Sequence, residues 1–168
     1  MSKEKSLDRA LHAALESDEV FRPWFLGQLA RGAGYSRLVF CRSNHPWGKV
    51  RLILPNPGTG ALEVVDKEGE TDVLAVFENL SGGRIGIHIE NKLANGSFTP
   101  YQPELYAARA EGWVGQEKHG FYQQWETVLV APSAFIERNV VDARKFTSRI
   151  THEQVARLIP AFALGSDA

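Results

Sequence analysis

The sequence is poorest in cysteine, with Cys41 as the only one among 168 residues. One thiol cannot form a disulfide within the chain and cannot build a cysteine-based zinc site. Long apolar runs are also missing, because no segment approaches the roughly 18 apolar residues that a membrane span needs. The opening "MSKEKSLDRA" has no apolar region of the kind found in a signal peptide. We therefore expect a soluble, cytoplasmic protein without a membrane partner.

A strong excess of one sign of charge is absent too. The chain has 19 Lys and Arg against 20 Asp and Glu, which gives a formal net charge of -1. This balance argues against a protein that coats nucleic acid through bulk positive charge, while a local basic groove remains open. Such a groove, or equally an ordinary solvated face, is expected from five residues: Arg31, Arg37, Arg42, Lys49 and Arg51.

No linker, repeat or low-complexity tract divides the chain. A chain of 168 residues is long enough to bury about 70 % of its unfolded-state surface around one core. We expect residues 1–168 to form a single domain.

Hydrophobic spacing and turn residues predict the order of helices and strands. Leucines four residues apart, at Leu7, Leu11 and Leu15, predict a first helix that ends near residue 17. Pro23 is expected to interrupt it before helical residues resume up to Gly32. An antiparallel run of strands is predicted over 36–43, 49–55, 61–65, 71–80 and 84–91, with "SGG" as the last hairpin turn. A helix over 99–112, a strand over 125–131 and a helix over 151–162 follow, so the expected fold is α/β, with a mixed central β-sheet flanked by helices.

The segment "GRIGIHIENK" alternates isoleucine with other residues, as a strand with one apolar face does. Ile85, Ile87 and Ile89 are expected to face the core, while Glu90 and Lys92 share the opposite face. The ordinary interpretation of such a pair is an exposed ion pair on a solvated strand, which contributes about 0–1 kcal/mol.

A second carboxylate changes this interpretation. Asp72 begins the strand that is expected to pair with the isoleucine strand, so Asp72 and Glu90 should lie at adjacent strand ends. Two carboxylates can share Mg²⁺ or Mn²⁺, which polarises a phosphoryl oxygen and acidifies water. The amine of Lys92 can then position that water or stabilise the charge of the transition state.

Asp72, the run Glu90-Asn91-Lys92 and a following helix with Gln102 and Tyr106 resemble the PD-(D/E)xK nuclease superfamily. The similarity is to the branch that has an additional Q-x-x-x-Y motif, and it covers roughly residues 70 to 110. The later segments "VLVAPSAFIE" and "SRITHEQVARLI" are similar to the tails of small, uncharacterised bacterial members. One position departs from the pattern, since a threonine precedes the aspartate where the superfamily nominally has proline.

The resemblance implies a restriction-endonuclease-like core and a set of site residues. Asp72 and Glu90 would hold Mg²⁺ or Mn²⁺, together with the backbone carbonyl of Asn91. Lys92 would be the catalytic lysine.

The resemblance also brings helix residues to the site. Gln102 and Tyr106, four apart on one helix face, would reach the same phosphate or metal. Simpler alternatives are a solvated Gln102 and a Tyr106 packed under the sheet. The family often adds a glutamate from the first helix, for which Glu16 is the best match and Glu19 the competitor.

These features together predict a metal-dependent nuclease that hydrolyses phosphodiester bonds with metal-activated water. Its expected partner is nucleic acid, foremost DNA, and cutting both strands of a duplex would favour a homodimer. Two alternatives stay open. One is a non-catalytic nucleic-acid-binding or protein-interaction module that retains the fold, and the other is a structural protein in which Glu90 and Lys92 merely pair at the surface.

Overall fold

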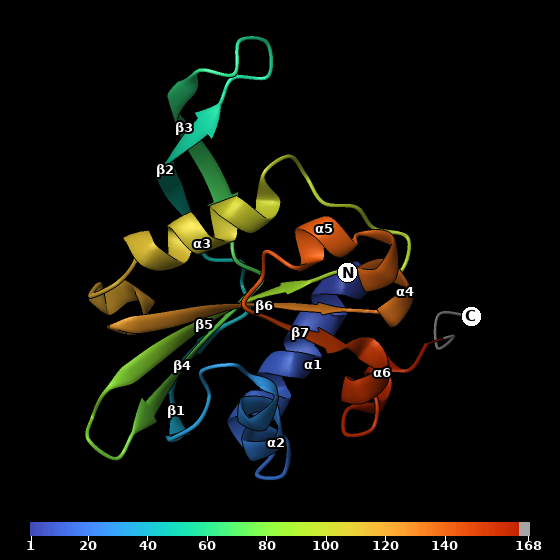
Figure 1. Ribbon diagram of the computed structural model, residues 1–168. Helices are drawn as coiled ribbons and strands as arrows, with labels where there is room; N and C mark the ends of the chain where they lie inside the picture. Colours follow the sequence, from blue (N-terminus) through green and yellow to red (C-terminus); the bar gives the residue numbers. More distant parts are fainter. Residues whose placement is uncertain (165–168) are drawn as a thin grey trace.

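A five-stranded mixed sheet organises the fold in the computed structural model, which describes residues 1–164 (Figure 1). The strand order is β1-β4-β5-β6-β7; β4 runs antiparallel to β1 and β5, whereas β5, β6 and β7 are parallel. The strands are β1 (Tyr35–Arg42), β4 (Val73–Asn79), β5 (Arg84–Asn91), β6 (Gln124–Ala131) and β7 (Ser148–Thr151). The predicted α/β fold with a mixed central sheet and flanking helices is confirmed.

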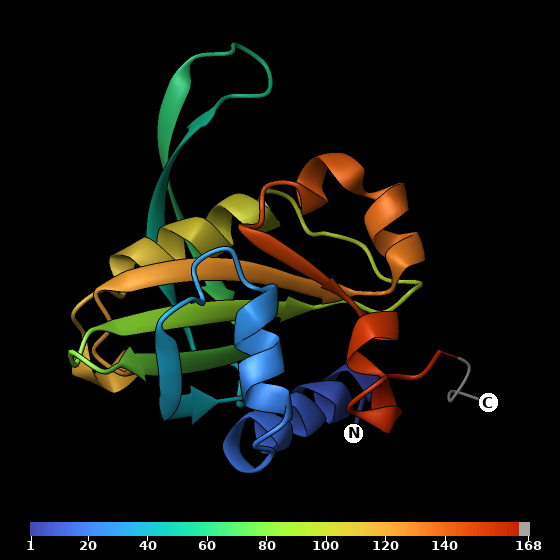
Figure 2. The same ribbon diagram turned by 60° about the horizontal axis from the view of Figure 1, so that its bottom comes forward.

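Helices cover both faces of this sheet (Figures 1 and 2). One face packs against α1 (Lys3–Ser17), α2 (Phe21–Gln28) and α6 (His152–Val155). The other face packs against α3 (Gln102–Gly112), α4 (Ser133–Arg138) and α5 (Val140–Ala143). Two short 3-10 helices, η1 (Glu117–His119) and η2 (Pro160–Phe162), complete the helical elements of the described residues. Hydrophobic burial on both sides therefore fixes the sheet as the middle of three layers.

Strand β5 is apolar toward α1 and polar toward α3. Ile85, Ile87 and Ile89 are fully buried in the cluster that contains α1 and α2, as their alternation predicts. The opposite face is covered by α3 rather than solvated, so His88 and Glu90 are only 0 % and 2 % exposed. The expectation of a solvated strand face is wrong, because alternation shows which face is apolar and not what covers the polar face.

Strands β2 (Trp47–Pro55) and β3 (Leu62–Glu70) form a separate two-stranded antiparallel sheet, the β2–β3 hairpin. This hairpin projects from the body of the molecule (Figures 1 and 2). Its inner face lies on α3, where a Cβ at Gly48 would be 3.2 Å from the Trp113 ring. The five predicted strands do pair antiparallel, but they are divided between two sheets: β1 pairs directly with β4, and the hairpin is inserted between them.

Several element boundaries also differ from the sequence prediction. Pro23 lies in the first turn of α2, where its missing N–H costs no helical hydrogen bond, and α2 ends at Gln28. The capping box of Thr151 and Gln154 is present, but the helix that it begins ends at Val155. The sequence does not predict β7, α4 or α5. Among the helices of residues 1–164, none has the length and apolar character required to cross a bilayer.

Gly86 in β5 provides a test of how tightly α3 and its neighbours pack on the sheet. A Cβ at this position would lie 2.4 Å from the ring of Tyr122, which is itself fully buried and cannot move away. We expect Gly86→Ala to lower the free energy of unfolding by about 1–3 kcal/mol through overpacking. Gly27→Ala in α2, where nothing lies within 4 Å of the added Cβ, is the control and should stabilise by about 0.5–1 kcal/mol. Urea denaturation measures both, and equal stabilities would contradict the packing described.

Candidate functional site

The candidate site lies where β4 begins and β5 ends. Val73 and Ile89 are paired across these antiparallel strands, and Asp72 and Glu90 stand one residue beyond that pair. The backbone amide of Asn91 donates a hydrogen bond of 2.9 Å to Asp72 Oδ2. Adjacent strand ends therefore bring the two carboxylates together.

The other residues predicted for the site converge on Glu90. Lys92 Nζ lies 3.1 Å from Glu90 Oε1, and Gln102 Nε2 donates to the same oxygen at 3.0 Å. The hydroxyl of Tyr106 bonds to Glu90 Oε2. Lys92 is only 8 % exposed, so the pair that it forms with Glu90 is not a surface ion pair. The alternative of a mere surface pair is wrong for this reason.

Tyr106 connects both strand ends to α3. Its hydroxyl oxygen accepts a hydrogen bond of 3.0 Å from the backbone amide of Asp72, and it also lies 3.3 Å from the carbonyl oxygen of Ile89. Burial, followed by the negative charges of Asp72 and Glu90, raises the pKa of Tyr106 well above its usual range. The phenol therefore keeps its proton and donates it. Tyr106 does pack under the sheet, as the simpler alternative held, but in direct contact with both acids.

Arg109, one turn further along α3, supports this arrangement from behind. Its guanidinium lies 4.6 Å from the centre of the Tyr106 ring, and Nε donates to Thr71 Oγ1 at 3.0 Å. Nη2 donates to the carbonyl oxygen of Glu70 at 2.6 Å. Arg109 is 1 % exposed. Its position at the site has no signal in the sequence, because a lone arginine in an amphipathic helix has no distinguishing pattern.

Thr71 extends the support to a buried histidine. Thr71 Oγ1 lies 2.8 Å from His88 Nδ1, and His88 Nε2 lies 2.9 Å from the Tyr122 hydroxyl. Burial, followed by the positive charge of Arg109, lowers the pKa of His88 well below its usual range. Because hydrogen bonds occupy both of its ring nitrogens, His88 is a structural residue rather than an ion ligand. The hydroxyl of Thr71, the residue before Asp72, thus joins Arg109 to His88.

Helix α1 brings two further acids, Glu4 and Asp8, which lie four residues apart on one face. Glu4, Asp72 and Glu90 each place one carboxylate oxygen within 4.8 Å of the others. Asp8 is fully buried and accepts a hydrogen bond of 3.2 Å from the side chain of Asn91. We call Glu4, Asp8, Asp72 and Glu90 the carboxylate cluster.

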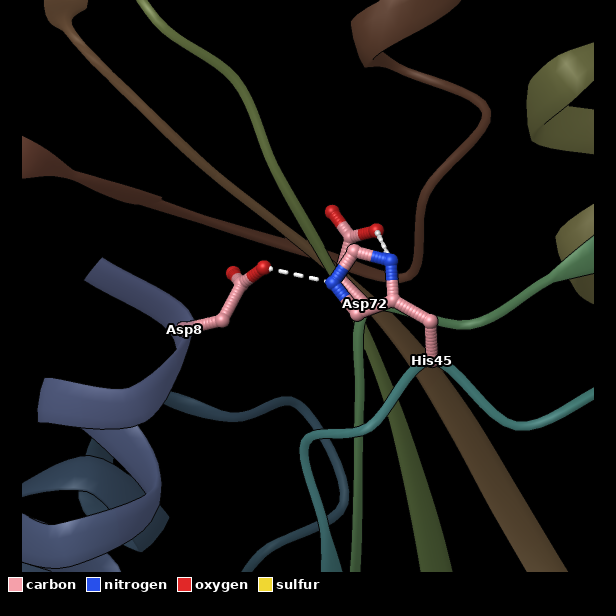
Figure 3. A group of neighbouring side chains, drawn as sticks. All are labelled: Asp8, His45 and Asp72. Carbon is pink, nitrogen blue, oxygen red and sulfur yellow. Dashed lines mark hydrogen bonds and ion pairs between the residues drawn. The ribbon is translucent and has the colours of Figure 1, made fainter. Parts of the chain in front are cut away.

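His45 lies between Asp8 and Asp72 (Figure 3). Its Nε2 is 2.9 Å from Asp8 Oδ2, and its Nδ1 is 2.9 Å from Glu70 Oε1 and 3.7 Å from Asp72 Oδ1. Burial disfavours the charged ring, but hydrogen bonds with Glu70 and Asp8 outweigh burial and raise the pKa of His45. The Asp8, His45 and Asp72 side chains also place ligand atoms within 4.8 Å of one another. Asp72 therefore belongs to two neighbouring groups of ligands.

The glutamate that the sequence assigns to the site from the first helix is misplaced. Glu16 bonds to His12 at 2.7 Å and is exposed. At about 1.5 Å of rise per residue it lies about 18 Å along α1 from Glu4. Glu16 therefore cannot share an ion with Asp72 and Glu90, and Glu19, beyond the end of α1, lies still further along the chain. Glu4 and Asp8 are the acids of α1 at the site.

The position of Asp8 at the site does have a signal in the sequence. It is spaced three and seven residues from Leu11 and Leu15 and therefore falls on their apolar stripe, where an acid needs a polar partner. His45 follows no pattern. It lies in the loop between β1 and β2, with a left-handed backbone (φ 54°), and only the folded chain brings it to Asp8.

The electrostatic balance of the site is negative. Burial, followed by the charges of Glu90 and Asp8, raises the pKa of Asp72 well above its usual range. Burial also raises the pKa of Glu90, although Lys92 and the Tyr106 hydrogen bond oppose it. Within residues 1–164, Lys92 pairs with Glu90, and His45 pairs with Asp8 when its ring is protonated.

The geometry of the cluster fits a hard divalent cation. Such ions prefer carboxylate oxygens at about 2.0–2.6 Å, so two ligands of one ion lie at most about 4–5 Å apart. The oxygens of Glu4, Asp72 and Glu90 lie within 4.8 Å of one another, which meets this limit. The role of the Asn91 carbonyl oxygen as a ligand stays a prediction.

The five basic residues considered for a nucleic-acid groove do not gather in one place: Arg37 and Arg42 line a cavity beside β1, whereas Lys49 and Arg51 lie on the hairpin. Arg37 pairs with Glu78 at 2.8 Å on β1, whereas Arg51 pairs with Asp66 at 2.9 Å on the hairpin. The other three are similarly divided: Lys49 lies near Glu68, Arg42 over the Phe40 ring, and Arg31 against the Trp125 carbonyl. Each of these basic side chains makes its own local contact.

No protein-family model, no curated protein and no solved structure matches this chain. The physical arrangement of the site therefore carries the functional argument.

Removing one acid tests whether repulsion between the carboxylates of the cluster lowers the stability of the folded protein. Asp72→Asn deletes a charge but keeps an oxygen that can accept from the Asn91 amide. Without divalent cations we expect its melting temperature to exceed that of the wild type, by about 2–4 °C for each kcal/mol of repulsion relieved. Asp142→Asn, an acid paired with Lys145 on the surface, is the control and should not rise. A wild-type or lower melting temperature for Asp72→Asn would show that the cluster is already balanced.

Proposed function

We propose that this protein is a metal-dependent nuclease that hydrolyses phosphodiester bonds of nucleic acid, foremost DNA. The observation that carries the proposal is the convergence of Asp72, Glu90 and Lys92 at adjacent strand ends. Gln102 and Tyr106 meet Glu90 from α3 at the same point. This set supports membership of the PD-(D/E)xK superfamily and a restriction-endonuclease-like core, both of which remain proposals.

The carboxylate cluster would hold Mg²⁺ or Mn²⁺ through Asp72, Glu90 and Glu4. When bound, such an ion supplies positive charge that polarises a phosphoryl oxygen and lowers the pKa of water. Glu90 is oriented for this role by Gln102 and Tyr106, and Asp72 is oriented by the amide of Asn91. Two fixed carboxylates give a preorganised site, which lowers the entropy cost of binding the ion and the substrate.

Lys92 would act on the reacting phosphate. Its ammonium lies beside Glu90, with Nζ 5.5 Å from the centre of the Phe98 ring, so the amine is confined to the edge of the cluster. From there it can position the attacking water by a hydrogen bond and stabilise the extra negative charge of the transition state. No other lysine or arginine in residues 1–164 pairs with a member of the carboxylate cluster.

One observation favours a module without turnover as the second candidate. Glu90 Oε1 already receives Lys92 and Gln102, and Oε2 receives Tyr106. An ion at Glu90 would have to share or replace one of these contacts. If they are too stable to yield, the same residues form a closed polar core, and the protein would bind its partners without cleaving them.

Metal binding is the first test. Calorimetric titration of the wild type with Mn²⁺ should show a site that is lost in Asp72→Ala and in Glu90→Ala, because each removes a carboxylate ligand. Glu16→Ala is the matched control: it deletes an acid of α1 outside the cluster and should bind Mn²⁺ as the wild type does. Equal binding by all four proteins would contradict the proposed ion site.

Cleavage is the second test, and it isolates Lys92. Labelled single- and double-stranded DNA and RNA would be incubated with Mg²⁺ or Mn²⁺. We expect Lys92→Ala to lower the cleavage rate by about 10²–10³, the cost of losing one electrostatic stabiliser. Lys92→Arg should not restore the rate, because guanidinium differs in geometry and does not deprotonate.

Lys145→Ala provides the control for this loss, since Lys145 pairs with Glu104 and Asp142 away from the carboxylate cluster. It should cleave at the wild-type rate. Similar cleavage by wild type and Lys92→Ala would locate the activity in another site or a contaminant. No cleavage by the wild type on any substrate, with Mn²⁺ binding intact, would favour the module without turnover.

A further inference from the structure

The outer face of the β2–β3 hairpin carries an apolar tip that the rest of the described chain leaves exposed. Ile53, Leu62 and Val64 are 66 %, 73 % and 62 % exposed. Ile53 is paired with Val64, and Leu62 with Pro55, so these side chains share one face next to one another. We call Ile53, Leu62 and Val64 the apolar tip. Neighbouring exposed apolar side chains of this kind mark interaction surfaces.

Two rows of opposite charge lie below the apolar tip on the same outer face. Strand β2 carries Lys49 and Arg51, and directly across from them β3 carries Glu68 and Asp66. Arg51 Nε lies 2.9 Å from Asp66 Oδ1, and Lys49 Nζ lies 3.7 Å from Glu68 Oε1. The face is thus positive along one strand and negative along the other.

This pattern disfavours nucleic acid as the occupant. Phosphate binding depends on basic side chains that can release counterions. Both basic side chains of the outer face already have an acidic partner, and the acids would repel a phosphate backbone. A protein surface that also has one row of basic and one row of acidic side chains would complement the outer face better than nucleic acid does.

We propose that the outer face of the β2–β3 hairpin binds the same face of a second copy of this chain. The two copies would be related by a two-fold axis that lies between the two facing hairpins and runs parallel to their strands. This axis places β2 of one copy over β3 of the other. Each positive row then faces a negative row, and the apolar tips cover each other.

A two-fold axis that lies in the same plane but runs perpendicular to the strands does not give this charge match. An axis across the strands places each strand over its own counterpart, so like charges meet. Facing sheets pack about 10 Å apart, a gap that lysine, arginine and glutamate side chains of both partners can span. Charge complementarity therefore selects one arrangement of the dimer.

The dimer is expected to be weak. Nine residues of β2 at about 3.3 Å each give a face about 30 Å long and two strands wide. Such a face is smaller than a standard stable interface of about 1,200–2,000 Å². Association should therefore depend strongly on protein concentration. It does not depend on the proposed nuclease activity, because the hairpin face contains no member of the carboxylate cluster.

Sedimentation velocity over a concentration series, in the presence of a chelator, tests the proposal. The wild type should shift from monomer toward dimer as concentration rises. Val64→Asp buries a charge in the apolar tip and should weaken association by about tenfold or more. Val141→Asp is the matched control, because Val141 is 72 % exposed on α5 and lies outside the hairpin. It should associate as the wild type does.

Charge reversal tests whether the two charged rows meet across the interface. Arg51→Glu makes the outer face mostly acidic and Asp66→Arg makes it mostly basic, so each variant alone should associate less than the wild type. An equimolar mixture should recover association, because the reversed rows are complementary between the two variants. Circular dichroism of each variant checks that the hairpin substitutions leave the fold intact.

Three results would overturn the proposal. A wild type that stays monomeric at every soluble concentration excludes the dimer. If hairpin variants of such a monomer weaken nucleic-acid binding, the outer face binds nucleic acid instead. A dimer that persists in Val64→Asp, or weakens equally in Val141→Asp, uses another surface. Absence of recovery in the mixture of charge variants contradicts contact between the charged rows of two copies.

Discussion

Two acids buried side by side constrain much of this structure. Taking a carboxylate out of water costs free energy unless hydrogen bonds or positive charge replace its hydration, and a second carboxylate nearby adds repulsion. Asp72 and Glu90 meet this requirement by drawing donors from several elements: the amide of Asn91, the amine of Lys92 and the phenol of Tyr106. The close packing of α3 on β4 and β5 therefore supplies hydrogen bonds to the buried acids as well as burying apolar side chains. Ala substitutions in α3 would disturb both.

Behind the carboxylates, a continuous set of buried polar contacts keeps the strand end in place. Arg109 joins the aromatic face of Tyr106 to Thr71, and Thr71 joins His88. Such networks are costly when a member is left without its partner, because the freed group stays buried. Each residue therefore constrains the next. Arg109 and His88 thus support the position of Asp72 indirectly, through Tyr106 and Thr71.

Local sequence patterns predicted the central sheet and its polar strand ends, since alternation in β5 and the turn before it are short-range properties. Gln102 and Tyr106, which the resemblance placed at the site, do meet Glu90, and helical spacing puts them on one face. Glu16 was misplaced, because an amphipathic pattern shows which face of a helix is buried but not which turn meets a strand end. His45 was missed for a related reason: its neighbours in space are far away in sequence. The hairpin was assigned to the main sheet, because strand pairing depends on tertiary contacts.

The inserted hairpin also has a consequence for the order of folding. Pairing of β1 with β4 joins Arg42 to Leu74 and must close a loop of roughly 30 residues, which carries an entropic cost. Strands β2 and β3 lie within that loop and are joined by a short turn, so they can pair first at low cost. Once formed, the hairpin holds the chain ends that lead to β1 and β4 close together at its base. The effective loop is then short, and the central sheet can close early despite the insertion.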